Sequence, residues 1–415
     1  MDELLIKAKA VKNSLMELLQ LTEEEKNTAL LKVAEVLEEN KGYILEANSK
    51  DVEAAIRRGE SKAIIDRLTL NEERINSMAQ GVRDVSSLKD PIGEVIETIH
   101  RPNGLTINKV RVPFGIIGII YEGRPNVTVD CFALALKSGN GAILRGSSSA
   151  LNSNMALVSL IKKALEETSV PASSIELIES PDRELVNRLL KLKDYVDVII
   201  PRGGAGLINA VVNNSTIPVL ETGVGNCHIY LDASASYSMS LKIVLNAKTQ
   251  RPGVCNAAEK LLVHKDFAEK HLHSLLMPLV SSGVELRGCP EARRICPSLL
   301  PAKAEDWDKE YLDLIMSVKV VNSLEEAIHH INSHSTKHTE AIITESKDNA
   351  DIFLSLIDAA VVVHNASTRF TDGGEFGFGA EIGISTQKLH ARGPMGLKEL
   401  TTYKYKLLGN GQTRI

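Results

Sequence analysis

The spacing of hydrophobic positions changes along the chain. Over the first 90 residues these positions recur at helical spacing, as from Leu21 to Asn48, where Thr22 and Glu25 form the sequence of a capping box. The stretch that begins at Thr69 opens in the same way, with Glu72 three residues later. The N-terminal region therefore predicts an outer layer of helices.

Two β-type runs follow between Ile92 and Val112, on either side of the turn sequence Pro102-Asn103-Gly104. This pattern predicts a β-hairpin. Because a two-stranded ribbon has too little core of its own, we expect it to pair with something else. The C-terminal tail ends in a strand-like run in which tyrosine and lysine alternate.

Short apolar runs then alternate with helical stretches. The runs of the first block are FGIIGIIYE, GAILRGS, SIELIES, VDVIIPRG and IPVLETG, with helices expected near 127–138, 149–167, 182–193 and 205–214. A second alternating block extends from NCHIYLD to AAVVVHN. Strands buried on both faces and separated by helices predict parallel, doubly wound sheets, whose ligands lie at the carboxyl ends of the strands. Those ends are YEGRPN, RGSSS, PRGGAG and ETGVGN.

Composition narrows the class of protein. A chain of 415 residues fits two or three domains, and a net charge of -5 with 4% aromatic residues argues against nucleic-acid binding. No apolar stretch is long enough to span a membrane, and the N-terminus is an amphipathic helix, so no membrane partner is expected. Five scattered cysteines without metal-ligand spacing indicate free thiols in a reducing cytoplasm and no metal site.

Two strand-end motifs are candidate phosphate sites, and each has a structural alternative. PRGGAG, with Gly203 and Gly204, would present backbone amides to a phosphate at a helix N-terminus, although glycine clusters also form simple turns. Arg145, with Ser147 and Ser148, would contact a phosphate or would be a solvated or structural arginine.

Local sequence leaves three further candidates open. Glu221 in LETGVGN is either a functional carboxylate or a salt-bridged residue of a turn. Cys255 precedes an expected helix, and it is either a small buried hydrophobe or a thiol whose pKa the helix N-terminus would lower. His338 and Glu340 suggest acid–base chemistry, but we assign no role to them. The glycine-rich stretch after His364 suits a loop that wraps a ligand.

Together these motifs resemble the aldehyde dehydrogenase superfamily. The resemblance rests on the alternating sheet, on the hairpin after the N-terminal helices, and on a glutamate, Glu221, 34 residues before Cys255. YEGRPNVTVD, PRGGAG, ETGVGNCH, QRPGVCNA, HTEAI, NASTRFTDG and HARGPMGLKELTTYKY resemble the branch that reduces L-glutamyl 5-phosphate. The motifs occur in order and cover essentially the whole chain.

The resemblance implies an aldehyde dehydrogenase-like α/β fold. It has two doubly wound α/β domains, one for the cofactor and one catalytic, and a β-hairpin oligomerisation flap. The NADP-binding domain is expected at 1–91, 113–228 and 365–397, the flap at 92–112 and 398–415, and the catalytic domain at 229–364. We expect a cytoplasmic homodimer or tetramer in which another subunit completes the sheet of the flap.

The implied reaction is the NADPH-dependent reduction of L-glutamyl 5-phosphate to L-glutamate 5-semialdehyde and phosphate, in proline biosynthesis. Cys255 is expected to form a thioester, and Asn126 to hold the oxyanion with the Cys255 backbone amide. Glu221 is expected to be a positional or thiol-activating group, because a hydrolytic base would waste the acyl phosphate. A separate glutamate 5-kinase is the expected source of the substrate and a candidate partner.

The resemblance also implies a set of binding residues. Arg145 stands where the superfamily has a lysine for the adenosine ribose, and Ser148 replaces the acid of NAD-preferring members, so NADPH preference is expected. Ser147, Gly203 and Gly204 complete the phosphate-binding set, and Glu310 is expected to hold the nicotinamide ribose. The expected residues for the anionic groups of the substrate are Arg124, Arg251, Ser367, Thr368 and Arg369.

Two alternatives stay open from the sequence. One is another member of the superfamily, an acylating or oxidising aldehyde dehydrogenase that uses NAD. The other is a non-catalytic binding member of the fold. The joint presence of Cys255, Asn126 and Glu310 argues against the second alternative.

Overall fold

The computed structural model describes residues 2–414, which form two compact units. Unit 1 contains the chain up to Thr222, Gly377–Gly383 and the segment from Met395 onward. Unit 2 contains Gly223–Phe376 and Ile384–Pro394. Within residues 2–414, none of the helices combines the length and the apolar character needed to span a bilayer.

One segment lies in a different unit from the one that the sequence suggests. The sequence groups residues 365–397 with the first unit, whereas most of this segment packs with unit 2. Polar contacts explain the difference, because the Thr339 hydroxyl donates to the Thr371 hydroxyl at 3.0 Å and Arg392 pairs with Asp358 at 2.7 Å. Such long-range contacts leave no mark on local sequence pattern.

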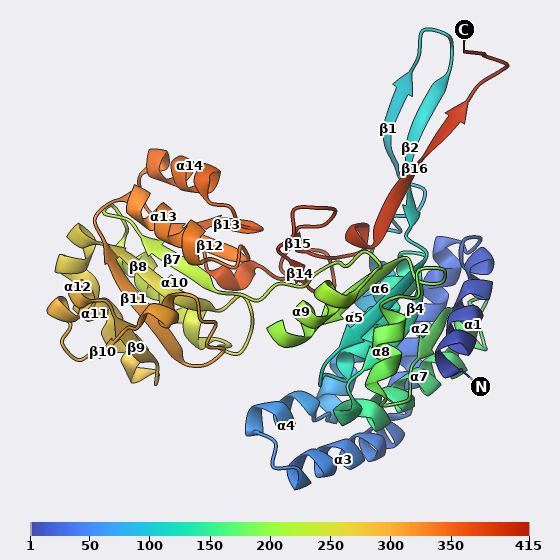
Figure 1. Ribbon diagram of the computed structural model, residues 1–415, viewed down its shortest axis with the longest axis horizontal. Helices are drawn as coiled ribbons and strands as arrows, with labels where there is room; N and C mark the ends of the chain where they lie inside the picture. Colours follow the sequence, from blue (N-terminus) through green and yellow to red (C-terminus); the bar gives the residue numbers. More distant parts are fainter. Residues whose placement is uncertain (1, 415) are drawn as a thin grey trace. The chain divides into compact units, whose positions relative to one another are not determined.

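The sheet of unit 1 has four parallel strands in the order β5-β4-β3-β6 (Figure 1). They are β3 (Ile116–Tyr121), β4 (Gly141–Gly146), β5 (Ile175–Leu177) and β6 (Val198–Arg202). The expected strand IPVLETG forms only an isolated bridge between Val219 and Ile199. Pro218 has no N–H for a ladder hydrogen bond, which limits pairing there.

Helices cover both faces of this sheet. They are α1 (Glu3–Leu18), α2 (Glu23–Glu39), α3 (Lys41–Arg57), α4 (Lys62–Leu68), α5 (Glu72–Ser87), α6 (Asn126–Lys137), α7 (Leu151–Leu165), α8 (Arg183–Leu189) and α9 (Ala205–Asn214). The predicted outer layer is present, since α2, α3 and α5 pack on α6 and α7. Helix α1 differs, because Leu4, Ala8 and Val11 are buried against the sheet itself in one cluster with α8 and α9.

The predicted start of α2 is confirmed and that of α5 is wrong. At α2 the Thr22 hydroxyl accepts from the Glu25 N–H at 3.2 Å, and the Glu25 carboxylate accepts from the Thr22 N–H at 2.8 Å. Helix α5 is capped by Asn71, whereas the Thr69 hydroxyl donates to the Ile65 carbonyl at 2.7 Å at the end of α4. Asparagine caps helices as well as threonine does, and the short α4 occupies Thr69.

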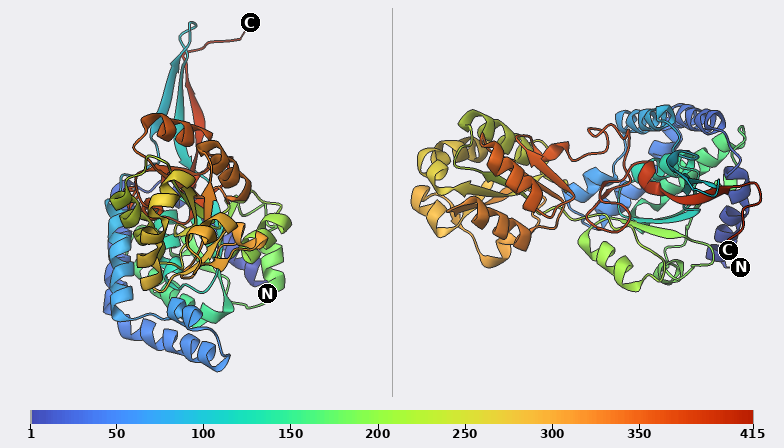
Figure 2. Two further views of the ribbon diagram at one scale, coloured as in Figure 1. Left: turned by 90° about the vertical axis from the view of Figure 1, so that its left-hand side faces the viewer. Right: turned by 90° about the horizontal axis from the view of Figure 1, so that it is seen from above.

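The predicted hairpin is confirmed and gains a third strand. Strands β1 (Val95–His100) and β2 (Thr106–Pro113) pair antiparallel, and β16 (Thr401–Leu408) pairs with β2 along its length. This sheet, which we call the flap, projects from the rest of unit 1 (Figures 1 and 2). Within the chain, the C-terminal strand supplies the pairing that a two-stranded ribbon lacks.

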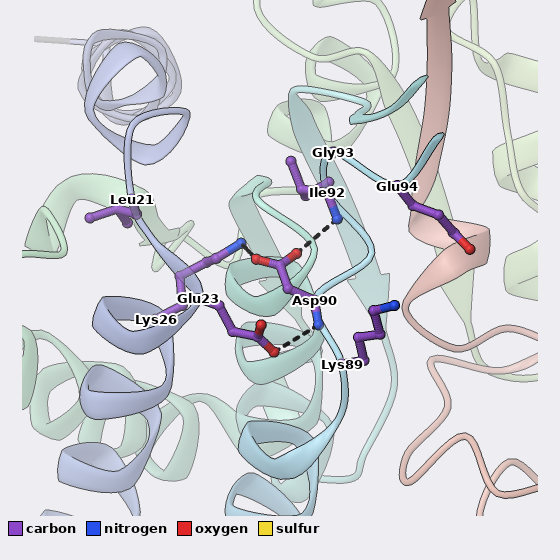
Figure 3. Close-up of a pocket in the computed structure, with 8 residues that line it drawn as sticks. All are labelled: Leu21, Glu23, Lys26, Lys89, Asp90, Ile92, Gly93 and Glu94. Carbon is purple, nitrogen blue, oxygen red and sulfur yellow. Dashed lines mark hydrogen bonds and ion pairs between the residues drawn. The ribbon is translucent and has the colours of Figure 1, made fainter. Parts of the chain in front are cut away.

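A cavity of about 460 Å³ lies at the root of the flap (Figure 3). Lys26 is 2% exposed and forms an ion pair with Asp90. The Asp90 N–H donates to the Glu23 carboxylate at 3.0 Å, and the Ile92 N–H donates to the Asp90 carboxylate at 2.8 Å. These contacts anchor the segment that leads from α5 to β1.

The sheet of unit 2 has seven parallel strands in the order β10-β9-β11-β8-β7-β12-β13. They are β7 (Cys227–Leu231), β8 (Ala258–His264), β9 (Glu285–Gly288), β10 (Leu300–Pro301), β11 (Ile315–Val321), β12 (Thr339–Ile343) and β13 (Val361–His364). The helices are α10 (Tyr237–Thr249), α11 (Lys265–Ser281), α12 (Pro290–Ile295), α13 (Leu324–His334) and α14 (Lys347–Leu356). A small antiparallel pair consists of β14 (Ile384–Ser385) and β15 (Gly393–Pro394).

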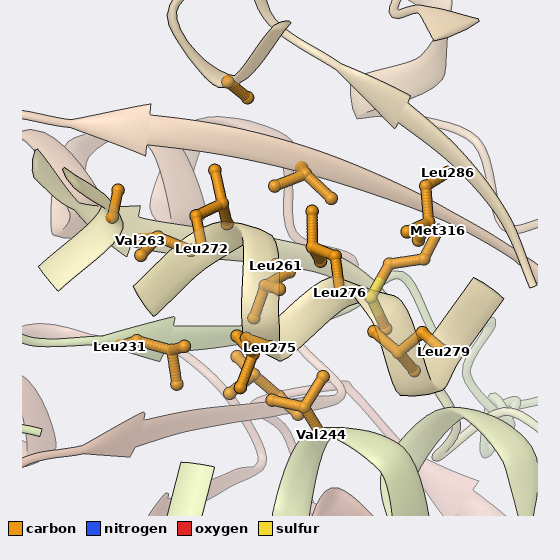
Figure 4. Packing of buried hydrophobic residues seen from close by; sticks show 14 of the residues in the cluster. Leu231, Val244, Leu261, Val263, Leu272, Leu275, Leu276, Leu279, Leu286 and Met316 are labelled. Carbon is orange, nitrogen blue, oxygen red and sulfur yellow. The ribbon is translucent and has the colours of Figure 1, made fainter. Parts of the chain in front are cut away.

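Alternate residues of these strands enter two different cores. Ile229 and Leu231 lie in the cluster formed with α10, α11 and α12, whereas Tyr230 lies in the cluster formed with α13 and α14. Figure 4 shows the first cluster, in which Leu272, Leu275, Leu276 and Leu279 of α11 pack on the sheet. Burial on both faces confirms the second doubly wound sheet.

Candidate active site

Cys255 lies in the turn that joins α10 to β8, and its side chain is half-buried. The helix expected directly after it is not formed, because residues from Ala258 onward pair with β7 and β11 in the sheet. The expectation that a helix N-terminus lowers the pKa of this thiol is therefore wrong. Any activation of the sulfur must come from other groups.

The backbone of Cys255 is packed tightly against β7. A Cβ atom at Gly225 would lie 1.5 Å from the Cys255 carbonyl oxygen, so a side chain at this position would displace the turn. The thiol of Cys227 donates to the same carbonyl at 3.2 Å. Contacts on two sides therefore hold the main chain at the candidate nucleophile.

The next residue, Asn256, is held by the 367–371 segment. The Thr368 hydroxyl donates to the Asn256 carbonyl at 2.7 Å, and the Asn256 amide donates to the Thr371 carbonyl at 2.8 Å. Ser367 accepts from the Arg369 N–H at 3.3 Å and caps the short helix η4 (Thr368–Phe370). Three of the expected substrate residues thus lie beside the Cys255 turn.

Two arginines carry positive charge to the same turn. Burial lowers the pKa of Arg369, while the Asp372 carboxylate raises it, the Arg251 charge lowers it and the Cys255 thiol raises it. The Arg369 Nε donates to the Gln250 side chain at 3.0 Å. Arg369 is therefore close enough to both Arg251 and Cys255 to interact with them electrostatically. The fifth expected residue, Arg124, belongs to unit 1.

Glu310 shares a neighbour with Cys255. Its Oε1 accepts a hydrogen bond at 2.7 Å from the N–H of Gly225, the glycine that packs on the Cys255 carbonyl. Burial raises the pKa of the Glu310 carboxyl. A carboxylate at this position can accept hydrogen bonds from sugar hydroxyls.

The other two expected catalytic residues belong to unit 1. Asn126 is the first residue of α6, and its amide donates to the Asp130 carboxylate at 2.9 Å. Burial raises the pKa of Asp130 to about 6, although Asn126 and Arg202 both lower it. Glu221 is half-buried and is the next-to-last residue of the first segment of unit 1, which ends at Thr222.

Arg145 and the serines after it could bind an anion. Arg145 is 6% exposed, burial lowers its pKa, and it donates to the Gly146 carbonyl. Within residues 2–414 its Nε has no hydrogen-bond partner, which suits a buried donor that awaits a ligand. Ser147 accepts from the Gly123 N–H at 3.2 Å, and Ser148 is exposed at the start of η1 (Ser148–Ala150).

The glycines before α9 are arranged around a carboxylate. The Glu122 side chain accepts from the Gly204 N–H at 2.9 Å, and a Cβ at Gly203 would lie 2.5 Å from the same oxygen. Helix α9 begins without a side-chain cap of its own, and the Glu122 carboxylate already places a negative charge at its N-terminus. The Arg145 guanidinium therefore fits a phosphate of a dinucleotide, whereas a phosphate at α9 would have to displace the Glu122 carboxylate.

Sequence analysis missed several residues that shape this region. Gly225 lies in the ETGVGNCH motif, but its contact with Cys255 is visible only in three dimensions, whereas Asp130 of YEGRPNVTVD is one helical turn from Asn126. Glu259 and Lys260 open the apolar run of β8, and charged residues at the start of a buried strand were a usable signal. Glu340, which the sequence suggests for acid–base chemistry without fixing a role, is buried beside His228, whose Nδ1 lies 3.0 Å from it. Across residues 2–414, no group of three or more His, Cys, Asp or Glu side chains is arranged to hold a metal.

A family model, described as the aldehyde dehydrogenase family, matches residues 2–283. The chain belongs to the aldehyde dehydrogenase family. Membership of this family implies a nicotinamide cofactor. Together with the two doubly wound sheets, it confirms the fold class expected from the sequence.

Individual members of the family match over their whole length. A protein of Caldanaerobacter subterraneus named gamma-glutamyl phosphate reductase is 57% identical over 412 residues, which is 99% of this chain and 100% of that protein. A protein of the same name from Clostridium perfringens is 57% identical over 413 residues and covers 100% of both chains. The crystal structure of gamma-glutamyl phosphate reductase from Thermotoga maritima superposes with a TM-score of 0.97 at 56% identity, with full coverage of both chains.

Proposed function

We propose that this chain reduces L-glutamyl 5-phosphate with NADPH to L-glutamate 5-semialdehyde and phosphate, in proline biosynthesis. The observation that carries the proposal is the Cys255 turn, where a half-buried thiol has Gly225 against its carbonyl and Arg369, itself close to Arg251, within electrostatic reach. Full-length identity of 57% to proteins named gamma-glutamyl phosphate reductase supports the choice of substrate.

Cys255 is the proposed nucleophile. Its thiolate attacks the γ-carbonyl carbon and the C–O bond to phosphate breaks. Inorganic phosphate departs, and the glutamyl group remains bound to Cys255 as a thioester. The Cys255 backbone N–H and the Asn126 amide are the proposed donors to the oxyanion of this step. After reduction the C–S bond breaks, and Cys255 is released as a thiol with the aldehyde product.

The anionic groups of the substrate require cations and hydroxyls. Arg251 and Arg369 are proposed to bind its phosphate and α-carboxylate, assisted by the hydroxyls of Ser367 and Thr368, and Arg124 is a further candidate. Hydrogen bonds between charged groups contribute about 1.5–3 kcal/mol each. Such contacts would orient the acyl phosphate toward the thiol.

The nicotinamide cofactor, when bound, supplies the hydride that reduces the acyl group. Arg145, Ser147 and Ser148 are proposed to hold its ribose phosphate, Gly203 and Gly204 its pyrophosphate, and Glu310 its nicotinamide ribose. A cationic Arg145 with no acid at position 148 favours the 2′-phosphate of NADPH. Glu221 is proposed to position or activate the thiol, because a base that hydrolysed the thioester would waste the acyl phosphate.

The two units are proposed to divide these tasks, unit 1 binding NADPH and unit 2 carrying the nucleophile. The flap is proposed to join subunits in a homodimer or tetramer. The acyl phosphate is reactive, so a glutamate 5-kinase in the same cytoplasm is the proposed supplier of substrate and a candidate partner.

The decisive experiment is phosphate-dependent NADP⁺ reduction with L-glutamate 5-semialdehyde. Wild-type protein should require phosphate and should have a higher kcat/KM for NADP⁺ than for NAD⁺. Cys255→Ser should lose activity by about 10³-fold or more, because an alcohol is a far weaker nucleophile. The control is Cys289→Ser, a buried cysteine that caps α12, where serine is also a good cap.

The control should keep activity within about threefold of wild type. Turnover by Cys255→Ser comparable to wild type would remove the nucleophile assignment. Reduction of NADP⁺ without phosphate would contradict the proposed substrate. Equal kcat/KM values for the two dinucleotides would contradict the role of Arg145.

A further inference from the structure

Buried charges lie on the strand that follows Cys255. Lys248 of α10 and Glu259 of β8 are both fully buried, with Nζ and Oε2 3.2 Å apart. Lys260, the next residue of β8, is also fully buried. Burying a charged group costs free energy unless the group is paired and hydrogen-bonded. Three buried charges, two on β8 and one on α10 beside them, therefore call for a structural explanation.

Two of these groups bind the backbone on either side of Glu310, and the third, Lys248, pairs with Glu259. The Glu259 carboxylate accepts from the N–H groups of Tyr311 at 3.2 Å and Leu312 at 3.3 Å. The Lys260 Nζ donates to the Lys309 carbonyl at 2.7 Å. Two neighbouring residues of one strand therefore fix the segment 309–312 from both sides of Glu310.

Backbone strain occurs in the same segment. Leu312 has a φ of 54°, in the left-handed region that non-glycine residues seldom adopt. The strained residue is one of the two whose N–H groups Glu259 binds. Such strain persists only where surrounding contacts over-determine the backbone, and it clusters at functional sites.

Ring contacts support the segment as well. The Lys260 Nζ lies 4.5 Å from the centre of the Tyr311 ring. The Tyr311 hydroxyl is 2.8 Å from the Asp306 carboxylate and 2.7 Å from the Ser317 hydroxyl. Tyr311 thus connects Lys260 to Asp306 and Ser317, which lie on either side of the segment 309–312 in the sequence.

The segment delivers one carboxylate to the Cys255 turn. Glu310 accepts from Gly225, whose backbone packs on the Cys255 carbonyl. Burial raises the pKa of Glu310, and the positive charges of Lys260 and Lys248 lower it, so the buried lysines also act on this carboxyl through space. The cluster therefore has both a mechanical and an electrostatic connection to Glu310.

We infer that Glu259, balanced by Lys248 and assisted by Lys260, is a positioning residue that holds the Glu310 carboxylate at Gly225 for cofactor binding. The inference rests on the proposed function, in which Glu310 binds the nicotinamide ribose. Glu259 itself touches neither substrate nor cofactor in this scheme. It acts by fixing the backbone that carries Glu310.

The test is a double-mutant cycle read out by NADPH binding. Glu259→Gln keeps the size of the side chain and removes its charge, and Glu310→Gln removes the proposed ribose ligand. Dissociation constants for NADPH, from the quenching or enhancement of its fluorescence, should rise about tenfold in each single variant. The double variant should bind no more weakly than Glu310→Gln alone, because Glu259 acts through Glu310.

Steady-state kinetics and stability separate positioning from general destabilisation. Glu259→Gln should raise the KM for NADPH while the KM for phosphate in the reverse reaction stays within twofold. Lys26→Met is the matched control, since Lys26 is an equally buried lysine paired with Asp90 at the root of the flap (Figure 3). It should lower Tm and leave NADPH affinity unchanged.

Each result decides the inference. Additive effects in the double variant, or unchanged NADPH affinity in Glu259→Gln, would overturn it while leaving the proposed reaction intact. Wild-type affinity in Glu310→Gln would overturn it together with the role of Glu310, and failure of wild-type protein to bind NADPH would overturn the proposed function. If Glu259→Gln does not fold because it leaves the buried Lys248 unpaired, Lys248→Met/Glu259→Gln and Lys260→Met replace it, because neither breaks up the Lys248–Glu259 pair one partner at a time.

Discussion

Asp130 lies one helical turn after Asn126 and accepts a hydrogen bond from its amide. Burial raises the pKa of Asp130 to about 6. Above that pH the carboxylate is ionised and is a strong acceptor for the Asn126 amide, whereas below it the protonated acid is a weaker one. The orientation of the Asn126 amide, the proposed oxyanion donor, therefore depends on whether Asp130 is ionised.

The Asp130→Asn variant tests this link through activity. For wild-type protein we expect kcat/KM to fall as the pH drops below about 6. The variant should be less active at pH 8, by about tenfold, and should lack this acidic limb. A pH–rate profile from pH 5 to 9 checks both expectations, and an unchanged acidic limb would contradict them.

The same variant should be more stable at pH 8. A raised folded-state pKa means that the protonated acid stabilises the fold fully below the unfolded value of 3.8, and that this stabilisation is lost as pH rises through about 6. At pH 8 the ionised carboxylate therefore costs on the order of 3 kcal/mol. Thermal unfolding should show a higher Tm for Asp130→Asn at pH 8, and a lower one would show that the carboxylate is well paired.

Individual residues differ in how far their sequence explains them. Cys255 was identified by its motif, yet its environment was not, because β8 rather than a helix follows it. Arg251 and Arg369 were expected near the thiol from the resemblance, and in unit 2 Arg369 interacts with both the Cys255 thiol and the Arg251 charge. Glu259 had no motif, because tertiary packing chooses the amides that it binds, whereas Asp130 lies in the YEGRPNVTVD motif one helical turn after Asn126.

At the scale of elements, the approach of β7 to the α10–β8 turn sets the position of the nucleophile. Gly225 lies just before β7, and its backbone leaves no space for a side chain against Cys255. The constraint belongs to two elements that are about 30 residues apart in sequence, joined by a parallel crossover. A glycine here serves close approach rather than an unusual φ.

Gly225→Ala should therefore disturb both stability and activity. We expect a loss of about 1–3 kcal/mol in unfolding free energy from overpacking and a fall in kcat/KM of at least about 100-fold, because the turn must move. Gly42→Ala in α3 is the control, since no atom lies within 4 Å of a Cβ there and alanine favours the helix. Urea unfolding and steady-state kinetics measure both quantities, and wild-type kinetics in Gly225→Ala would show that the turn is not constrained.

Most elements followed from hydrophobic spacing, and each failure has a physical cause. The helices near 127–138 and 205–214 and the strands β3, β4 and β6 lie where apolar periodicity placed them. The run IPVLETG does not become a strand, and Asn71 replaces Thr69 as a cap. Pro218 prevents regular strand pairing in the first case. In the second case the end of α4 uses the Thr69 hydroxyl, so Asn71 caps α5 instead.

At the scale of the whole molecule, the flap presents large apolar side chains that are about half exposed. Tyr403, Tyr405 and Leu407 of β16 are 49%, 52% and 60% exposed. Exposed apolar side chains on a projecting sheet are typical of association surfaces. This exposure supports the proposal that the flap joins subunits.

Leu407→Lys should weaken the proposed assembly. A charge placed in an apolar subunit contact costs a few kcal/mol, so the dissociation constant of the oligomer should rise by about tenfold or more. Light scattering after size-exclusion chromatography measures the mass over a dilution series, with Lys406→Gln as a control on the same strand. A monomeric wild-type protein, or equal masses for all three proteins, would contradict the oligomerisation flap.

The amino-acid sequence by itself determined the elements, the α/β class and the family, because periodic burial and contiguous motifs are local properties that short stretches of chain carry. Only the tertiary structure decided that Gly225 meets Cys255, that Glu259 reaches the amides beside Glu310, and that residues 365–376 pack with unit 2. These contacts join positions tens of residues apart, and the free energy of burial selects them only when whole sheets have formed. The sequence motif therefore identifies the reactive thiol, and the tertiary packing determines which groups surround it.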